Sequence, residues 1–291
     1  MPNRLGHGLT GTTGILGVIG DPIGHSLSPA MQNAALGALE QNFIYVPFQV
    51  SPSRLQEAIG GVRALGIRGI NVTIPHKVGV IDHLDEVDPV AQLIGAINTI
   101  SNVDGCLVGY NTDGIGFLRS LEEEAGRAPQ GQNVTILGAG GAARAIGFQL
   151  ALSGIKGLIL ANRTESRALA LATEIQERTG CVATAASLDD LAAYLPATDI
   201  LINTTSLGMY PEVTSTPPVK VNLLPLTALV CDIVYNPGET ILLQEAGARG
   251  LATLPGLGML AYQGAASLEI WLGIKAPIDV MKSALYRQLG L

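Results

Sequence analysis

The sequence predicts an α/β protein of two domains with mainly parallel sheets. The chain has 291 residues, about twice the length of an average domain. Short runs rich in β-branched residues alternate with helical patterns along almost the whole chain, as expected for βαβ units. With 47% hydrophobic and 14% charged residues, the chain has enough apolar side chains to fill two cores.

The expected elements follow from the periodicity of apolar residues. Strands are expected at 15–20, 44–50, 68–73, 97–101, 106–110, 133–137, 157–161, 199–203 and 229–233. Helices are expected at 29–40, 53–65, 88–94, 114–125, 141–153, 164–178 and 239–248. Two more helices, 257–272 and 278–289, follow each other without a strand, and the second has apolar residues every three or four positions.

The domain boundary is expected at the helix 114–125. This helix ends in a run of glutamates, and a polar stretch rich in glycine and proline follows it up to residue 132. Residues 1–113 therefore form one predicted domain and residues 114–255 a second. The last two helices have no further strand to cover, so residues from about 256 to 291 are expected to return to the first domain.

Composition excludes several classes of function. The net charge is −7 without a cluster of lysine and arginine, which argues against nucleic acid and membrane surfaces as partners. Mean hydropathy is +0.36, but no apolar stretch of about 18 residues lacks polar interruptions, so no membrane-spanning helix is expected. Three distant cysteines and four histidines show no metal-ligand or disulfide spacing, which predicts no metal site and a reducing cytoplasm. Residues 1–14 are expected to be a short lead-in and not a signal peptide.

The most specific motif is a glycine turn between the strand 133–137 and the helix 141–153. Gly138 permits a tight turn, Gly140 lets the backbone approach a pyrophosphate, and Ala143 keeps the helix close to the strand. The phosphates would meet the N–H groups at the positive end of the helix. A Rossmann-like dinucleotide-binding domain is therefore predicted, with an ordinary glycine-rich turn as the alternative.

The strand 157–161 indicates which dinucleotide binds. An NAD site usually has an acidic residue at this strand tip to bind the ribose 2′-hydroxyl. Here the strand ends in Asn162, Arg163 and Thr164, with Arg167 nearby, and the guanidinium of Arg163 suits a 2′-phosphate. These residues predict NADP(H), although Thr164 could equally cap the next helix while the arginines remain surface residues.

Four polar clusters follow strands of the first domain, at the edge where open α/β sheets bind ligands. In the first, Ser28 precedes Pro29 and could simply cap a helix, but capping does not explain Ser26, and two hydroxyls at a helix start could hold a carboxylate. In the second, Asn71 and Thr73 share one face of a strand. Lys77 then falls at the start of the helix that Pro75 would open, where the helix dipole disfavours a cation.

The third and fourth clusters contain Asn98 and Asp113. Asp113 could cap the helix 114–125, or it could act on a substrate together with Lys77. A lysine held beside an aspartate can move the proton that accompanies oxidation of an alcohol or reduction of a ketone, without a metal. The residues alone therefore predict hydride transfer to or from a small, polyhydroxylated anion.

Seven motifs occur in an order that is characteristic of one family. They are His25-Ser-Leu-Ser-Pro29, Asn71-Val-Thr-Ile-Pro-His-Lys77, Gly95-Ala-Ile-Asn-Thr99, Asn111-Thr-Asp-Gly114, Gly138-Ala-Gly-Gly-Ala142, Asn162-Arg-Thr164 and Gly256-Leu-Gly-Met-Leu260. On these motifs the chain closely resembles shikimate dehydrogenase over essentially its whole length after about Gly14.

The resemblance implies an NADP-dependent enzyme that interconverts shikimate and 3-dehydroshikimate in the pathway to aromatic amino acids. It implies that Lys77 is the catalytic lysine and Asp113 its hydrogen-bonded partner. The substrate contacts that it implies are Ser26, Ser28, Asn71, Thr73, Asn98, Asp113, Tyr235 and Gln263. The cofactor contacts that it implies are Gly138, Ala139, Gly140, Gly141, Ala142, Asn162, Arg163, Thr164, Arg167, Ile233 and Gly256.

Two positions depart from the family's pattern. Pro255 stands where many relatives have aspartate, and Pro89 stands where some have an acidic residue near the cofactor. A broader quinate/shikimate dehydrogenase that uses NAD is the alternative enzyme, and an NADP-binding regulator without catalysis is the alternative outside enzymes. The presence of both Lys77 and Asp113 argues against the regulator. The chain is expected to act as a monomer or a homodimer on small molecules.

Overall fold

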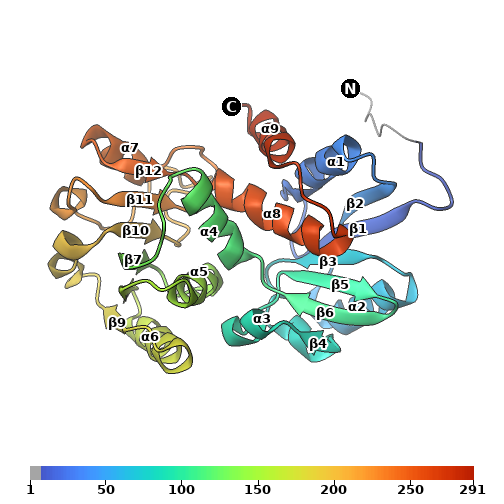
Figure 1. The fold of residues 1–291 in the computed structure, drawn as a ribbon, viewed down its shortest axis with the longest axis horizontal. Helices are drawn as coiled ribbons and strands as arrows, with labels where there is room; N and C mark the ends of the chain where they lie inside the picture. The colour runs from blue at the N-terminus through green and yellow to red at the C-terminus, as the bar shows by residue number, and fades with distance from the viewer. Residues whose placement is uncertain (1–7) are drawn as a thin grey trace. The chain divides into compact units, whose positions relative to one another are not determined.

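The computed structural model describes residues 8–291, so the first seven residues of the expected lead-in lie outside the described residues. The described chain divides into two compact units (Figure 1). Unit 1 comprises the residues up to Thr112 together with Ala261–Leu291, and unit 2 comprises Asp113–Leu260. Each unit contains one six-stranded sheet, and each is described by itself below.

The sheet of unit 1 has the strand order β2-β1-β3-β5-β6-β4. The strands are β1 (Gly14–Gly20), β2 (Phe43–Gln49), β3 (Gly69–Val72), β4 (Glu86–Val87), β5 (Thr99–Val103) and β6 (Cys106–Tyr110). Strand β5 is antiparallel to β3 and to β6, whereas the other pairs are parallel. The sheet is mixed because Asp104 and Gly105, both at positive φ, form the two-residue hairpin that joins β5 to β6.

The C-terminal segment completes unit 1. The helices of unit 1 are α1 (Ser28–Ala38), α2 (Leu55–Ala64), α3 (Pro89–Ile94), α9 (Ile278–Leu289) and the greater part of α8 (Leu257–Leu272), and the last two belong to the C-terminal segment. Helix α9 packs against α1. The indole of Trp271 is fully buried and donates to the carbonyl oxygen of Ile100, 2.9 Å away. Trp271 fits there because Gly69 has no side chain, since a Cβ at this position would collide with the indole.

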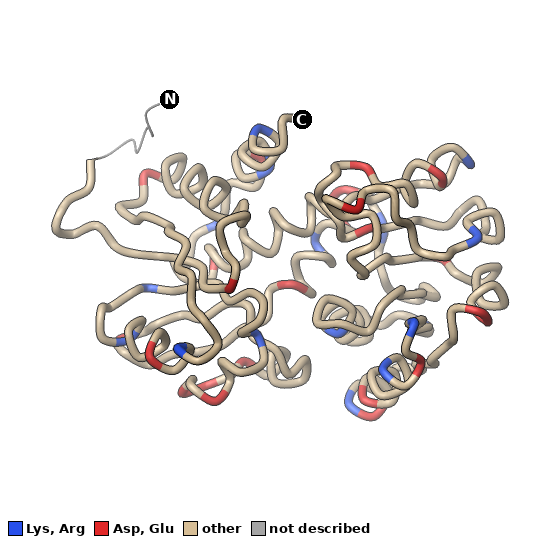
Figure 2. The backbone as a smooth tube through the Cα atoms, turned by 180° about the vertical axis from the view of Figure 1, so that it is seen from behind, with Lys and Arg blue, Asp and Glu red and all other residues tan. Residues whose placement is uncertain are grey.

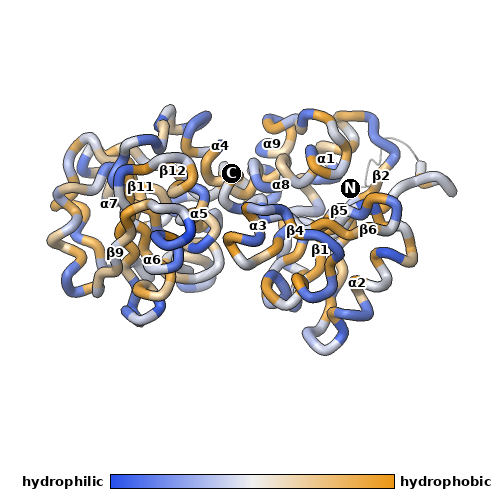
Figure 3. Tube along the Cα trace, turned by 60° about the horizontal axis from the view of Figure 1, so that its bottom comes forward, coloured by the Kyte–Doolittle hydropathy of each residue, from blue (hydrophilic) through white to orange (hydrophobic). Residues whose placement is uncertain are grey.

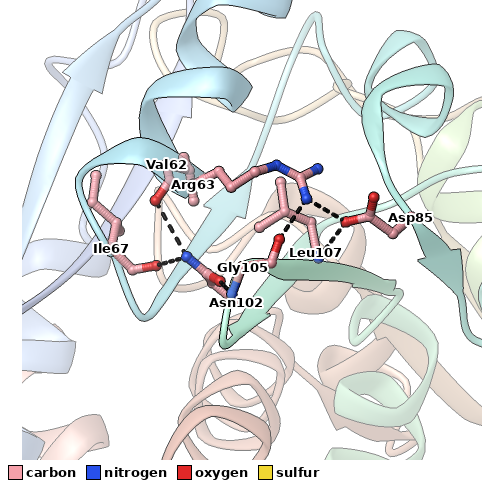
Figure 4. Close-up of polar contacts among 7 residues, drawn as sticks. All are labelled: Val62, Arg63, Ile67, Asp85, Asn102, Gly105 and Leu107. Atoms are coloured by element: carbon pink, nitrogen blue, oxygen red, sulfur yellow. Dashed lines mark hydrogen bonds and ion pairs between the residues drawn. The ribbon is translucent and has the colours of Figure 1, made fainter.

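A polar cluster ties α2 to the β5–β6 hairpin (Figure 4). The guanidinium of Arg63 donates to the carboxylate of Asp85, at 2.8 Å, and to the carbonyl oxygen of Gly105. The same carboxylate accepts a hydrogen bond from the N–H of Leu107 at 2.7 Å. Asn102 adds hydrogen bonds with the backbone of Val62, Ile67 and Gly105.

The sheet of unit 2 is parallel throughout, with the strand order β12-β11-β10-β7-β8-β9. The strands are β7 (Asn133–Leu137), β8 (Gly157–Ala161), β9 (Ala183–Ala186), β10 (Ile200–Asn203), β11 (Leu229–Asp232) and β12 (Ala252–Leu254). The chain proceeds outward from β7 in one direction and from β10 in the other. This doubly wound order places a switch point between β7 and β10, where such sheets bind dinucleotides.

The helices of unit 2 are α4 (Asp113–Glu123), α5 (Gly141–Leu152), α6 (Glu165–Thr179) and α7 (Ile241–Ala248). Helix α5 is apolar and mostly buried, whereas α6 buries one stripe of side chains, Ala168, Leu171, Ala172 and Ile175. Gly147 of α5 leaves room for the side chain of Ile175, because a Cβ there would lie 2.9 Å from its terminal methyl.

The fold class predicted from the sequence is confirmed, and each strand and helix expected from the apolar periodicity is present, whereas the helix expected to open at Pro75 is not. Three short strands were not predicted, namely β4, β9 and β12, because two to four residues show no clear periodicity. Hydrophobic positions concentrate along the strands in Figure 3, and Figure 2 shows acidic and basic positions mixed along the backbone. Among the described residues, no helix is long and apolar enough to cross a membrane.

Candidate active site

Unit 1 gathers polar side chains at one edge of its sheet. This edge holds the carboxyl ends of β1, β3 and β6 and, because β5 runs in the opposite direction, the start of β5. Asn71 therefore lies opposite Thr99 in the sheet register, and the turn after β6 brings Thr112 beside Asn98. The predicted motifs around residues 71, 98 and 112 meet here.

Asn71 is 7% exposed and its side-chain amide is held on both sides. Its nitrogen lies 2.9 Å from the hydroxyl of Ser267 and 3.1 Å from the Thr99 hydroxyl and from the carbonyl oxygen of Asn98. Its oxygen accepts a hydrogen bond from the phenol of Tyr45 at 2.7 Å. These partners fix which amide atom is the donor and which is the acceptor.

Asn98 is held in a similar way and is 2% exposed. Its side-chain oxygen accepts hydrogen bonds from the N–H of Thr112 at 2.7 Å and from the Thr99 hydroxyl at 2.9 Å. Its nitrogen donates to the Thr112 hydroxyl at 2.9 Å. Two asparagines with fixed orientations suit the recognition of several hydroxyl groups on one small molecule.

The two predicted serines lie around the start of α1. Leu27 occupies the N-cap position and makes no capping hydrogen bond, while Ser28 is the first helical residue. The alternative that Ser28 caps the helix is therefore wrong. The N–H of Ser28 donates to the hydroxyl of Ser26 at 3.3 Å, and the Ser28 side chain lowers the pKa of the nearby Tyr45 phenol, against the larger effect of burial. Burial raises the pKa of Tyr45, so this phenol stays protonated.

Lys77 is half-buried in the turn that follows β3. Its carbonyl oxygen accepts a hydrogen bond from the N–H of Ile97 at 2.7 Å, which places Lys77 beside the segment that contains Asn98. The helix expected to open at Pro75 is not an α-helix, because only a short 3-10 turn begins at Gly79. The helix-dipole argument for Lys77 is therefore wrong.

Of the other predicted substrate contacts, Thr73 lies at the end of β3 and Gln263 lies on α8, where its carbonyl oxygen accepts a hydrogen bond from Ser267 at 3.0 Å. Asp113 is buried and is the first residue of α4 in unit 2. The pairing of Lys77 with Asp113 stays a prediction.

No group of three acidic, histidine or cysteine side chains within residues 8–291 could hold a metal ion.

The glycine turn of unit 2 has the geometry that phosphate binding requires. Gly138 has a φ of +109°, and its N–H donates to the carbonyl oxygen of Ala161 at 2.8 Å. A Cβ on Gly138 would lie 2.6 Å from the hydroxyl of Thr204. By contrast, a Cβ on Gly140 or Gly141 would meet no atom within 4 Å, so the start of α5 is open to a ligand.

The loop after β8 presents the residues expected around a 2′-phosphate. Arg163 and Arg167 are exposed, and the side-chain nitrogen of Asn162 donates to the carbonyl oxygen of Thr164 at 2.9 Å. Thr164 occupies the N-cap position of α6, but its side chain makes no capping hydrogen bond. Thr164 therefore stands where a capping residue would, but its hydroxyl does not cap the helix.

The segment after β11 contains Ile233 and Tyr235, and Gly256 packs against it. A Cβ on Gly256 would collide with the carbonyl group of Ile233, so only glycine allows this close approach. Tyr235 is half-buried, and burial raises the pKa of its phenol. Pro255 precedes this contact, and Pro89 begins α3 directly after its N-cap Asp88.

Models of known families match three parts of the chain. A shikimate dehydrogenase substrate-binding domain matches residues 18–100, a shikimate/quinate 5-dehydrogenase model matches 121–210, and a shikimate 5'-dehydrogenase C-terminal domain matches 256–286. A shikimate dehydrogenase (NADP+) from Moorella thermoacetica is 50% identical over 96% of this chain and 95% of its own length. The chain belongs to the shikimate dehydrogenase family.

Solved structures of shikimate dehydrogenases have the same fold. One in complex with NADP+ is 47% identical, has a TM-score of 0.92, and covers 98% of this chain and 99% of its own. Another, from Listeria monocytogenes in complex with shikimate and NAD, is 39% identical with a TM-score of 0.92 and covers 97% and 100%. The predicted family is thereby confirmed.

Sequence reasoning for this shikimate dehydrogenase missed three side chains that contact predicted site residues, two in unit 1 and one in unit 2. The Tyr45 phenol and the Ser267 hydroxyl hydrogen-bond the side chain of Asn71, and Thr204 lies close to Gly138. Only Ser267 had a readable signal, because it lies four residues after Gln263 and so shares its helix face.

Proposed function

We propose that Lys77 and Asp113 perform the acid–base step by which this chain interconverts shikimate and 3-dehydroshikimate with NADP(H). The activity is that of shikimate dehydrogenases, to which the chain is 45–50% identical over nearly its full length. The observation that supports the site most directly is the pair of fixed asparagines, Asn71 and Asn98, beside the turn that holds Lys77.

Lys77 is the proposed group that takes the proton from the substrate hydroxyl during oxidation and returns it during reduction. Asp113 is proposed to bind the Lys77 ammonium and to stabilise its charged form, which is present after oxidation of the hydroxyl and before reduction of the ketone. The proton transfer needs no metal ion. The Lys77 amine accepts and releases the one proton, and the Asp113 carboxylate offsets the positive charge that the amine gains.

The polar edge of unit 1 is the proposed substrate site. Ser26 and Ser28 would bind the carboxylate, since their hydroxyls lie at the start of α1, where N–H groups favour an anion. Asn71 would present its side-chain oxygen, because its nitrogen is already surrounded by three acceptors. Thr73, Asn98, Tyr235 and Gln263 are the remaining proposed contacts.

The residues of unit 2 fit NADP. The open backbone of Gly140 and Gly141, with Gly138, Ala139 and Ala142, would hold the pyrophosphate, and Arg163 with Asn162, Thr164 and Arg167 would hold the 2′-phosphate. Ile233 and Gly256 would line the nicotinamide end. When bound, this cofactor supplies or accepts the hydride.

A broader enzyme is the second candidate. The matching family model covers quinate as well as shikimate dehydrogenases, and the Listeria monocytogenes structure contains NAD. Against this, no acidic residue stands at the tip of β8, where Asn162, Arg163 and Thr164 follow, to bind the 2′-hydroxyl of NAD, whereas two exposed arginines lie in this loop.

The deciding experiment measures NADPH oxidation after 3-dehydroshikimate is added to the purified protein. Comparison of kcat/KM for shikimate and quinate with NADP+ and NAD+ then separates the two candidates. We expect the highest value for shikimate with NADP+, and an equal or higher value for quinate with NAD+ would favour the broader enzyme.

The reaction is proposed to occur in the cytoplasm, because Cys106, Cys181 and Cys231 are all free thiols, as is usual in a reducing compartment. The acting species is proposed to be a monomer or a homodimer, which light scattering distinguishes.

A further inference from the structure

Asp232 is a buried carboxylate that the reaction does not use directly. It is 1% exposed and ends β11, opposite Asn203 at the end of β10. One carboxylate oxygen accepts hydrogen bonds from the side-chain nitrogen of Asn203 and from the N–H of Val234, both at 3.0 Å. The other accepts a hydrogen bond from the hydroxyl of Thr240 at 2.7 Å.

The orientation of the Asn203 amide is fixed independently. Its side-chain oxygen accepts from the N–H of Thr205 at 3.0 Å and from the Thr205 hydroxyl at 2.7 Å. A backbone N–H can only donate, so the nitrogen of this amide must face Asp232. Asp232 therefore receives hydrogen bonds from three donors, and these oppose the rise in the pKa of its carboxyl that burial causes.

These hydrogen bonds hold two loops at the carboxyl edge of the sheet. The Val234 bond holds the segment Ile233–Tyr235 from one side, and the close approach of Gly256 to the Ile233 carbonyl holds it from the other. On the β10 side, Thr204 follows Asn203 directly, and its hydroxyl donates to the carbonyl oxygen of Leu137, just before the glycine turn. The backbone between β11 and Tyr235 is therefore held at Val234 by Asp232 and at Ile233 by Gly256.

We infer that Asp232 is a positioning residue: through Val234, Asn203 and Thr240 it holds Ile233 and Tyr235 where they contact cofactor and substrate. This inference rests on the proposed function, because it uses those two contacts. Asp232 itself contacts neither ligand in this proposal. Its loss should reduce turnover without reducing the affinity of unit 2 for the adenosine part of the cofactor.

The first test is Asp232→Ala, which leaves the donors of Asn203, Val234 and Thr240 without their acceptor. We expect kcat/KM for shikimate to fall by roughly 10²-fold, the loss typical of a reacting group displaced by about 1 Å. Binding of adenosine 2′,5′-bisphosphate, measured by calorimetry, should remain near the wild-type affinity, because this probe requires Arg163 and not the segment 233–235. Equal losses of probe binding and of turnover would overturn the inference, since they would indicate general disruption of unit 2.

A milder pair of variants covers the case in which Asp232→Ala does not fold. Thr240→Val removes only the hydroxyl that donates to Asp232, and Thr240→Ser retains it. Thr198→Val is the matched control, because Thr198 is also 2% exposed and its hydroxyl bonds that of Thr135 at 2.8 Å, before the start of β10. We expect Thr240→Val to lower kcat/KM by roughly 10-fold, Thr240→Ser to restore it, and Thr198→Val to reduce thermal stability alone.

The inference is contradicted if Thr240→Val and Thr198→Val change kcat/KM equally, or if Thr240→Ser is as impaired as Thr240→Val. Failure of the proposed function has a different signature, namely wild-type protein that does not oxidise NADPH with 3-dehydroshikimate.

Discussion

The side-chain nitrogen of Asn71 lies 2.9 Å from the hydroxyl of Ser267, although the two residues are 196 positions apart in the chain. Asn71 is the penultimate residue of β3, the third strand of unit 1, and Ser267 lies on α8 near the C-terminus. The last helices therefore complete the polar edge of unit 1, because one of them contributes a hydroxyl to the fixed orientation of a predicted substrate contact.

Ser267→Ala is expected to lower the free energy of unfolding by about 2 kcal/mol, because the buried hydroxyl hydrogen-bonds Thr99, Thr112 and the carbonyl oxygen of Gln263 as well as Asn71. The KM for shikimate should change little, because the Asn71 nitrogen keeps the Asn98 carbonyl and the Thr99 hydroxyl as acceptors. Urea unfolding and steady-state kinetics measure the two effects, with Ser53→Ala, at an exposed serine, as the control. A large rise in KM at unchanged stability would contradict this account.

The Asp85 cluster predicts a dependence of stability on acid pH. The Arg63 guanidinium and the Leu107 N–H hold the pKa of the Asp85 carboxyl below its ordinary value. A pKa that is lower in the folded state stabilises it above the unfolded pKa of about 3.9, and this contribution is lost as the pH falls through the folded value. The destabilisation caused by Asp85→Asn should therefore be largest near neutral pH and shrink below about pH 4.

Urea unfolding of wild type and Asp85→Asn at several pH values between neutral and about pH 3 tests this expectation. Asp189→Asn, at an exposed position, is the control. A difference between wild type and Asp85→Asn that stays constant across this range would show that the carboxyl has the same pKa in both states.

The elements and the glycine turn could be predicted because their signals are local. The motif from Gly138 to Ala143 shows its turn and its helix start within six residues, and the structure has both. The partners of Asn71 could not be predicted, because Tyr45 and Ser267 are brought to it by the order of strands and the return of α8. The expected helix at Pro75 was wrong, because the chain forms hydrogen-bonded turns before Gly79. Local helix propensity is a weak guide at such a position, because tertiary contacts can override it.

Arg163→Ala should weaken NADP+ binding far more than NAD+ binding, because only the 2′-phosphate offers oxygens for a bidentate guanidinium contact. Binding titrations with both nucleotides measure the ratio of the two losses. Arg287→Ala, on the last helix, serves as the control. Equal losses for the two nucleotides would show that Arg163 does not contact the 2′-phosphate.

The glycines of the turn should separate folding from cofactor binding. Gly140 has a φ of −92° and space for a Cβ, so Gly140→Ala should leave thermal stability unchanged and weaken NADP+ binding by crowding the pyrophosphate. Gly138→Ala should lower both, because φ is +109° and the new Cβ would crowd the Thr204 hydroxyl. Thermal unfolding without nucleotide and titration with NADP+ distinguish them. Normal NADP+ affinity in Gly140→Ala would exclude a close approach of phosphate at this position.

Lys77→Ala tests the proposed acid–base step. If Lys77 transfers the proton in the transition state, kcat should fall by roughly 10²-fold or more while the KM for shikimate changes little, because the asparagines and serines proposed to bind the ring and the carboxylate are unchanged. Lys156→Ala, which removes an exposed lysine of unit 2, is the matched control and should retain wild-type kcat. Loss of kcat in Lys77→Ala with a pH profile that no longer shows a basic group would assign the proton to this amine. Near-normal kcat would instead exclude Lys77 from the proton transfer, whatever its contribution to binding.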